Sequence, residues 1–554
     1  MRTNIQSDSL RIDFAEDFSI DGLFILKEST KVCAAGEQSL IIRTHNAVSD
    51  PAVLQSIQSV EKTKDSIQLY FADDRNEYSY TVEFIKSTNG VLVKIKVDAP
   101  RPIWLVEWKL NGFDFDEVLV PALGGQSISK DMPQGSSLSY KYPFWWNSQF
   151  VIGKTTNGGL IFRSEDKSNE LKLLRVSKTK KNFEITFGQE AAAPLNSNHL
   201  EYEFFIEAFE GDWKRGVNIH KKWMKENFNL VDYKKHPHYP EWMENINFIL
   251  EPWGARKGTK AHHTFDQIVD RLHDWKKLHD PNQTLLYLPG YAQNGVDSNA
   301  PNYDPSEQCG GPEKFKVLVD TAHRLGYKVM IHTNILAMTF VHPLYEEYKK
   351  FTTTDPWGRE LTWGLDIDGD WLPEPFFAYM NPGYNEWGDL MTKVLGDLIN
   401  KYKLDAVFVD QTLLAFNNNR GPNFIQGMHD HIKRLQEEFP RVLFAGEGIN
   451  ERVLPRLPVV QIHGIDSIAE VHGMDDRVQW RNVHPISSYL FGDYTKFMAH
   501  LLTKHTSDPM FKLQEESYAK LNVIPSLSLY SYEQEMDTPE TRKMIERAKR
   551  LNKE

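Results

Sequence analysis

Cysteine is scarce in this sequence: only Cys33 and Cys309 occur among 554 residues. Two cysteines cannot build a disulfide framework or, by themselves, a zinc site, so ordinary reduced thiols are the expected state. Long apolar runs are also absent, since no stretch of about 20 apolar residues is present to span a bilayer. The segment from Met1 to Phe14 lacks the apolar core of a signal peptide, which predicts a soluble, cytoplasmic protein. Replacement of a leader by Met1 would give the same sequence, so a secreted or periplasmic location stays open.

The sequence also lacks an excess of positive charge. The formal net charge is −12 and no long basic run occurs, which argues against nucleic acid or an anionic membrane as the main partner. The sequence also has no phosphate-cradling glycine loop and no convincing GxSxG motif, which disfavours nucleotide-dependent and serine-hydrolase functions.

The composition is that of a globular protein, with 40% hydrophobic and 25% charged residues. A chain of 554 residues is long enough for two or more domains, or for one barrel with a large appendage. Aromatic residues reach 12% and include 14 tryptophans. Flat aromatic faces are common in sugar-binding clefts, but large cores use them as well.

The first part of the chain alternates polar and apolar residues. The segments 66–72, 78–85, 91–97 and 103–110 show this period of two, and residues 170–187 have the pattern of a hairpin. We therefore predict that residues 1–210 form an antiparallel β-sandwich domain.

The period changes after Phe209. Val217, Ile219, Trp223 and Met224 fit one helical face, and residues 236–242 are rich in proline and aromatics. Residues 211–243 are therefore predicted to be a connecting helix and a linker.

From residue 244 to residue 554 the pattern becomes strand, loop and helix, repeated. This pattern is typical of a parallel sheet with crossover helices, and here it predicts a (β/α)₈ TIM barrel. The expected strands are residues 246–254, 283–290, 327–334, 404–410, 441–448, 459–464, 484–491 and 522–531. The intervening segments 291–312 and 335–387 are unusually long, and loops of this length are usually functional or carry structure of their own.

Two of the expected strands end on a carboxylate. The apolar run Ala406 to Val409 leads into Asp410, and Val442 to Ala445 leads into Gly446, Glu447 and Gly448. Consecutive barrel strands place their C-terminal ends side by side, where barrel enzymes carry their catalytic groups. Two carboxylates in one pocket are what cleavage of a glycosidic bond requires. Asp410 and Glu447 are therefore the catalytic candidates, although a strand-end Asp can also shape a loop and Glu447 could salt-bridge a neighbour.

Polar groups follow other strands as well and could bind sugar hydroxyls or stack on sugar rings. The substrate-binding candidates are Trp253, Tyr291, His332, Asn334, His463 and Asp466, with Glu251 and Glu470 as reserve acids.

No metal or other cofactor is expected in catalysis. The segment Asp366 to Asp370 is similar to a calcium loop, but its glycine is at the fourth position and no acid stands at the twelfth. A structural calcium there stays open. The pair His262 and His263 lacks metal-ligand spacing with a nearby acid or histidine.

Several short stretches resemble retaining glycoside hydrolases of the α-amylase-like and α-galactosidase-like assemblage, in particular endo-α-N-acetylgalactosaminidases and related bacterial proteins. These stretches are FEGDWKRG followed by HKKW, then MNPGYNEW, LDAVFVDQ and FAGEG. The resemblance implies that Asp410 is the nucleophile on the fourth strand and that Glu447 is the acid/base on the fifth. The sequence departs from the pattern of the α-amylase relatives at one point. Their HD-type transition-state stabiliser after the seventh strand has no clear match here, unless His463 with Asp466, or Asp475 with Asp476, takes its place.

These observations lead to the hypothesis of a glycoside hydrolase that acts on an oligo- or polysaccharide, as a retaining α-glycosidase. An inverting glycosidase or a transglycosylase on the same scaffold is one alternative. Another is a barrel that binds carbohydrate without catalysis, because a fold does not dictate a function. The identity of the sugar, its linkage, exo or endo action and the oligomeric state stay open.

Overall fold

In the computed structural model, residues 3–551 are described except for 27–29, 37, 47, 56, 169, 257–259, 366–371, 373, 463–481 and 500–508. The chain divides into two compact units. The first, here called the two-sheet unit, comprises Met1–Asn229 and His484–Leu490, and the second, here called the barrel unit, comprises Leu230–Val483 and Phe491–Glu554. Helix α1 (Trp213–Asn227), which the sequence assigned to a connector, belongs to the two-sheet unit.

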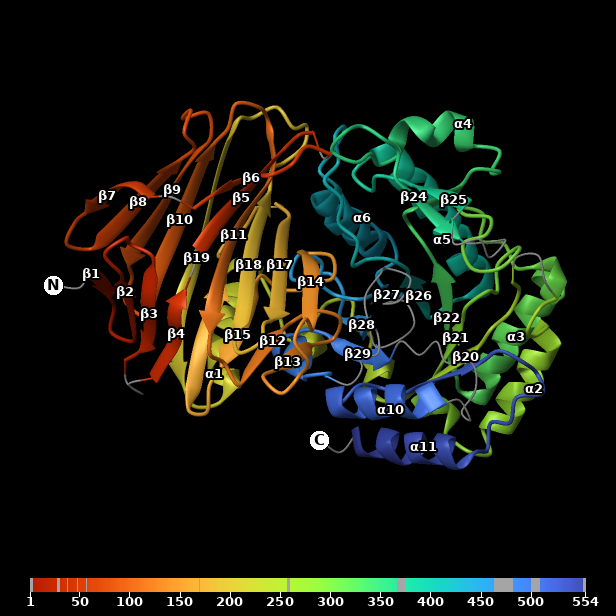
Figure 1. Cartoon of the computed structure of the whole chain (residues 1–554). Helices are drawn as coiled ribbons and strands as arrows, with labels where there is room; N and C mark the ends of the chain where they lie inside the picture. The colour runs from red at the N-terminus through yellow and green to blue at the C-terminus, as the bar shows by residue number, and fades with distance from the viewer. Residues whose placement is uncertain are drawn as a thin grey trace. The chain divides into compact units, whose positions relative to one another are not determined.

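Two antiparallel sheets make up the first unit (Figure 1). The described part of one sheet contains β1 (Thr3–Gln6), β2 (Leu10–Phe14), β3 (Ile20–Ile25), β4 (Thr30–Gly36), β5 (Gln38–Thr44), β6 (Ala52–Leu54), β11 (Ile103–Phe113), β14 (Ser137–Tyr142), β17 (Lys172–Lys178) and β18 (Phe183–Glu190). The other contains β7 (Ile57–Lys62), β8 (Ser66–Ala72), β9 (Ser79–Lys86), β10 (Gly90–Asp98), β12 (Glu117–Val120), β13 (Gln126–Ser129), β15 (Phe150–Lys154), β16 (Gly158–Arg163) and β19 (His199–Glu210).

Aromatic side chains join the inner faces of the two sheets. The rings of Trp108 on β11 and Phe204 on β19 lie 5.0 Å apart, and those of Phe14 on β2 and Phe84 on β9 lie 5.2 Å apart. The alternation predicted from the sequence explains this arrangement, because every second residue of a strand points to the same face. The expectation of mainly antiparallel strands in this region is confirmed.

A parallel sheet forms the core of the barrel unit. Its described strands run in the order β29 (Lys496–Ala499), β28 (Val459–Ile462), β27 (Leu443–Glu447), β26 (Ala406–Val409), β22 (Lys328–Thr333), β21 (Thr284–Leu288), β20 (Phe248–Pro252) and β30 (Ser526–Leu529). Among the described residues, a parallel bridge between Met498 and Ile524 connects the two ends, so the barrel is nearly closed.

Helices separate most of these strands. They are α2 (Phe265–Trp275), α3 (Gly311–Leu325), α5 (Asn385–Tyr402), α6 (Phe424–Glu438), α9 (Ile486–Phe491), α10 (Pro509–Leu521) and α11 (Pro539–Leu551), and Figure 1 shows α10 and α11 running side by side. Short 3₁₀ turns occur at Tyr233–Lys235, Glu241–Glu244, Pro281–Gln283, Glu307–Cys309 and Lys349–Phe351. Between β27 and β28 the described chain forms turns instead of a helix, so a strict strand and helix alternation is interrupted there.

The prediction of a seventh strand at residues 484–491 was wrong. These residues contain α9, and the strand is the short run Lys496–Ala499. Ile486 and Leu490 are both fully buried and are four residues apart, which is helical spacing. A short apolar run alone does not distinguish a buried helix from a strand.

The long segment 335–387 carries its own structure. It contains a three-stranded antiparallel sheet of β23 (Ala337–Thr339), β25 (Glu374–Tyr379) and β24 (Thr362–Leu365), together with α4 (Tyr345–Tyr348). The calcium-like segment 366–370 within it lies outside the described residues.

Two further sequence expectations concern cysteines and membrane spans, and a third observation concerns the core of the barrel. Cys33 and Cys309 are both free and buried, and burial raises the pKa of the Cys309 thiol to about 11. In the described part of the chain, no helix has the length and hydrophobicity needed to cross a membrane. A cluster of buried apolar side chains fills the barrel and comes from alternate strand positions, including Ala406 and Phe408 of β26 and Leu443 and Ala445 of β27.

We predict that Leu443→Ala destabilises the barrel unit by about 2–5 kcal/mol, because it removes a fully buried side chain and leaves a cavity. Denaturant unfolding should therefore show a lower midpoint. Val317→Ala on α3 is the control: Val317 is 50% exposed, and its replacement should change the stability by no more than about 0.5 kcal/mol. Equal midpoints for the two variants would contradict the assignment of Leu443 to the core.

Candidate active site

Polar side chains line the C-terminal end of the barrel, one step beyond the apolar core. In β26 the inward positions are Ala406 and Phe408, and the same period of two leads to Asp410. In β27 the inward positions Leu443 and Ala445 lead to Glu447. The two strands are parallel, with Phe408 opposite Ala445, so Asp410 and Glu447 stand at the same level.

Asp410 and Glu447 are in direct contact. The carboxyl group of Glu447 is close enough to Asp410 for its charge and a side-chain hydrogen bond to influence the pKa of Asp410. Burial raises the pKa of Asp410 well above its usual value, and the negative charges of Glu447 and Asp297 and the hydrogen bond to Glu447 raise it further. Asp410 therefore tends to keep its proton at pH values where an ordinary carboxyl group has lost it.

The loop after β26 is folded back onto Glu447. The backbone N–H of Gln411 donates to Glu447 Oε2 at 2.8 Å, and Gln411 has a left-handed backbone with φ of 59°. The Thr412 hydroxyl donates to the Glu447 carbonyl at 2.9 Å. A side chain on Gly446 would collide with this hydroxyl, at 2.5 Å from Thr412 Oγ1, so the glycine allows the close approach of the loop. Glu447 is consequently held in place and is only 5% exposed.

Asn334 connects three acidic or amide groups. Its Nδ2 donates to Asp297 Oδ2 at 3.2 Å, to Asp410 Oδ2 at 3.4 Å and to Gln411 Oε1 at 2.9 Å. The contact follows from the sheet register, since His332 on β22 pairs with Phe408 and the next inward positions are Asn334 and Asp410. The amide donor favours the charged form of Asp410.

His332 lies between a tyrosine and a carboxylate. The distance from Tyr287 Oη to His332 Nδ1 is 2.7 Å, and His332 Nε2 lies 3.6 Å from Asp297 Oδ1. Burial, and then the charges of Glu251, Asp410, Glu447 and Asp297, raise the pKa of Tyr287 well above its usual value. The phenol therefore stays protonated, and its O–H can donate a hydrogen bond to Nδ1. This contact orients the imidazole with Nε2 toward Asp297.

Trp253 and Tyr291 have different environments. Trp253 is half-buried and stacks on Tyr530, with ring centroids 5.0 Å apart. Tyr291 is only 1% exposed and stacks on Phe315 of α3 at 5.2 Å. This burial favours a packing role for Tyr291 over contact with a substrate. The reserve acid Glu251 is also buried, and its Oε2 accepts a hydrogen bond from the Ser528 hydroxyl at 2.5 Å.

His463, Asp466, Glu470, Asp475 and Asp476 lie outside the described residues. Their proposed roles in binding, as a reserve acid or as a transition-state stabiliser therefore stay predictions.

Several residues of the site were not singled out from the sequence. Asp297 comes from the long segment 291–312 and accepts a hydrogen bond from Tyr303 Oη at 3.0 Å. Tyr379 comes from β25 in the long segment 335–387, and its hydroxyl accepts from Gln411 Nε2 at 3.3 Å. The length of both segments was the available signal, but no local pattern marks which of their side chains reach the barrel.

One group of side chains has the chemistry of metal ligands. Ligand atoms of Asp297, His332 and Asp410 lie within 4.8 Å of one another. The fit is imperfect, because Asn334 Nδ2 directs its N–H donors at carboxylate oxygens of both Asp297 and Asp410, where a cation would need them. The observed hydrogen bonds satisfy these oxygens with a neutral amide donor.

Comparison of the sequence with protein families matches residues 198–499 to a family model described as a domain of unknown function, DUF6259. A search of curated proteins found no match to the sequence.

Solved structures match the fold over almost the whole chain. The alpha-N-acetylgalactosaminidase NagBb from Bifidobacterium bifidum, in complex with GalNAc, has a TM-score of 0.74 at 12% identity and covers 99% of this chain and 93% of its own. Its ligand-free form gives a TM-score of 0.73 at 13% identity, with coverage of 100% and 92%. The GH36 alpha-galactosidase AgaA from Geobacillus stearothermophilus gives a TM-score of 0.48 at 8% identity, with coverage of 100% and 86%. The match to NagBb shows a shared fold.

We predict that Asp410→Asn stabilises the protein progressively as the pH rises from about 4 to about 7. The raised pKa of Asp410 means that the folded chain holds this proton at pH values where the unfolded chain, with a pKa of about 3.9, has released it. The wild type therefore loses stability with rising pH in this window, and the asparagine variant does not. Its Tm should gain about 2–4 °C relative to the wild type across the window.

Thermal unfolding followed by circular dichroism at several pH values measures this difference. Asp397→Asn is the matched control, because Asp397 is exposed and pairs with Lys393 on the surface of α5. Parallel pH profiles for wild type and Asp410→Asn would contradict the raised pKa.

Proposed function

The chain belongs to the DUF6259 family, and we propose that it is a glycoside hydrolase that cleaves α-glycosidic bonds of an oligo- or polysaccharide with retention. The observation that carries this proposal is the hydrogen-bonded pair of Asp410 and Glu447 at the C-terminal ends of neighbouring barrel strands. The fold shared with NagBb, an alpha-N-acetylgalactosaminidase, supports it.

The short separation of the two carboxyl groups favours retention. An inverting enzyme needs its carboxyl groups about 6.5–9.5 Å apart to hold a water between them, whereas a retaining enzyme needs about 5–5.5 Å. The direct interaction of Glu447 with Asp410 is closer to the retaining arrangement than to one with a water between the two groups.

In the proposed first step, an oxygen of ionised Asp410 attacks the anomeric carbon while the bond to the leaving oxygen breaks. Glu447 transfers its proton to that oxygen. In the second step Glu447 takes a proton from water, the water oxygen bonds to the anomeric carbon, and Asp410 is released. The raised pKa of Asp410 opposes the ionised form that the first step requires, and the Asn334 amide and the Gln411 backbone N–H partly offset this effect.

Substrate binding is proposed for the residues around this pair. The half-buried ring of Trp253 offers an apolar surface to a sugar face. His332 and Asn334 provide polar groups for sugar hydroxyls, and His463 and Asp466 remain candidates. Because NagBb binds GalNAc, aryl α-N-acetylgalactosaminides and aryl α-galactosides are the substrates to test first.

Asp410→Gly should lose turnover of an activated aryl α-glycoside by roughly 10³-fold or more, because no glycosyl-enzyme bond can form. Added azide should restore cleavage by filling the space of the lost carboxylate, and the product should be the β-glycosyl azide. Release of the aryl alcohol and NMR of the sugar product measure both effects. Asp397→Asn is the control with unchanged turnover. Full activity of Asp410→Gly without azide would remove Asp410 from the mechanism.

Glu447→Ala should give a different pattern. Its kcat should fall by about 10²–10⁴-fold for poor leaving groups that need a proton, and far less for 2,4-dinitrophenolate, which does not. Azide should then yield the α-glycosyl azide, since it attacks the intermediate on Asp410. Equal losses with good and poor leaving groups would show that Glu447 is not the acid. A barrel that only binds carbohydrate would show no turnover of any aryl glycoside in the wild type.

A further inference from the structure

One sheet of the two-sheet unit forks. Along one edge, β11 pairs with β5 from Ile103 to Leu110, and then with β4 at Phe113. The change of partner coincides with a register shift between Leu110 and Phe113, where Gly112 has φ of 87°. An extra residue in a strand bends it and leaves positions without a partner. Strands β5 and β4 therefore occupy successive stretches of the same edge of β11, and their outer partners differ: β6 for β5 and β3 for β4.

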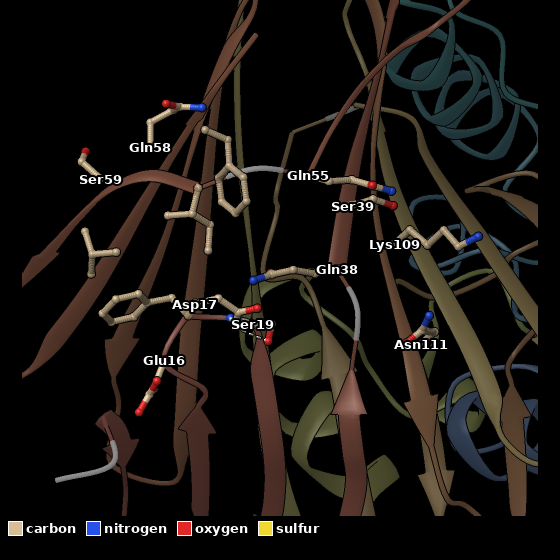
Figure 2. Close-up of a pocket in the computed structure, with 14 residues that line it drawn as sticks. Glu16, Asp17, Ser19, Gln38, Ser39, Gln55, Gln58, Ser59, Lys109 and Asn111 are labelled. Atoms are coloured by element: carbon tan, nitrogen blue, oxygen red, sulfur yellow. Dashed lines mark hydrogen bonds between the residues drawn. The ribbon is translucent and has the colours of Figure 1, made fainter. Parts of the chain in front are cut away.

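A cavity of about 750 Å³ lies at this fork. Small-molecule sites in proteins are usually of about 300–1,000 Å³, so the space is large enough for a ligand. The labelled side chains in Figure 2 surround it, with Gln38 in their midst. Its lining includes amide and hydroxyl side chains from several strands: Ser19, Gln38, Ser39, Gln55, Gln58, Ser59 and Asn111.

Gln38 is the strongest indication of a ligand. It is the first residue of β5 and only 8% of its surface is exposed. Neither Nε2 nor Oε1 of its amide has a hydrogen-bond partner among the described residues. A buried amide normally has its donor and acceptor satisfied, because each unpaired group retains the cost of removing it from water. Gln38 lines the cavity, so a ligand there can become the partner of this amide when the side chain turns toward the open space.

The charged groups of the cavity already have partners or lie at its exposed edge. Lys109 Nζ forms an ion pair with Glu184 at 2.7 Å. The carboxylate of Asp17 accepts hydrogen bonds from the backbone N–H of Ser19 at 3.0 Å and from its hydroxyl at 2.7 Å. Glu16 is an exposed carboxylate, which disfavours an anionic ligand. The remaining groups are neutral donors and acceptors.

Apolar rings complete the lining. Phe18 is half-buried and has an unusual positive φ of 62°, which a bulky residue rarely adopts. Phe71 is buried and stacks on Tyr80 at 4.1 Å. Amides and hydroxyls that bind hydroxyl groups, combined with a partly accessible ring such as Phe18 that contacts C–H surfaces, are the chemistry that recognises a sugar.

We propose that this cavity is a carbohydrate-binding site for a neutral mono- or oligosaccharide, separate from the barrel, with the Gln38 amide as its central contact. Every residue that lines it belongs to the two-sheet unit. The proposal does not depend on catalysis by Asp410 and Glu447, since it uses none of their residues.

The full-length chain with Asp410→Asn, in which the proposed turnover is blocked, provides the test. The labelled protein is applied to a printed array of neutral mono- and oligosaccharides, and the sugars that bind are titrated by calorimetry. Adding Gln38→Leu should raise the Kd of at least one sugar by about tenfold or more, because two hydrogen bonds are lost while the side-chain volume is nearly kept.

Gln126→Leu is the matched control. Gln126 lies in the same unit, is fully buried and also has an amide without partners among the described residues, but it does not line the cavity. Its replacement should leave the Kd unchanged. Should Gln38→Leu fail to fold, the double variant Gln55→Ala with Gln58→Ala tests the same site, since both side chains are exposed at its rim.

Loss of binding in the cavity variants, with normal binding in the control, supports the proposal. Sugar binding that is identical in all variants, or no sugar bound at all, overturns it. Hydrolysis of aryl α-glycosides by Gln38→Leu in the otherwise wild-type chain is measured in parallel. Normal hydrolysis without Gln38-dependent binding rejects only this site, whereas binding without any hydrolysis rejects only the proposed function.

Discussion

The in-register parallel pairing of β26 and β27 is the constraint on which the candidate site depends. A parallel pair in register, with every second side chain directed inward, brings Asp410 and Glu447 to the same height above a closed apolar core. A shift of one residue in either strand would turn its carboxylate out of the barrel. The apolar residues below, from Ala406 to Phe408 and from Leu443 to Ala445, therefore fix the positions of the two carboxyl groups above them.

The same arrangement has an energetic cost. Two carboxyl groups in contact and largely removed from water cannot both be charged without a penalty, which is why the pKa of Asp410 rises. The surrounding groups limit the cost: Asn334 donates to Asp410, and the Gln411 backbone donates to Glu447. Such opposed demands are common at functional sites, where stability is reduced in favour of reactivity. The fork between β4 and β5 shows a related feature, since the buried Gln38 amide is left without partners.

Much of the architecture could be predicted because local patterns report it. The period of two marked the antiparallel strands, and seven of the expected barrel strands coincide with β20, β21, β22, β26, β27, β28 and β30. The exception, residues 484–491, is short enough that its apolar residues suit either a helix or a strand. The missing helix between β27 and β28 and the small sheet within 335–387 arise from contacts that no local period encodes.

By itself, the sequence determined which carboxylates end the fourth and fifth barrel strands, because a buried strand and the residue after it are encoded within a few neighbouring positions. Only the tertiary structure decided that these carboxyl groups touch, that Asp297 and Tyr379 join them from long segments, and that Tyr291 packs against Phe315 instead of facing a cleft. It also decided that Gln38, an ordinary strand residue by pattern, lies in a cavity. These outcomes depend on pairing between residues far apart in the chain, and on where a strand changes its partner.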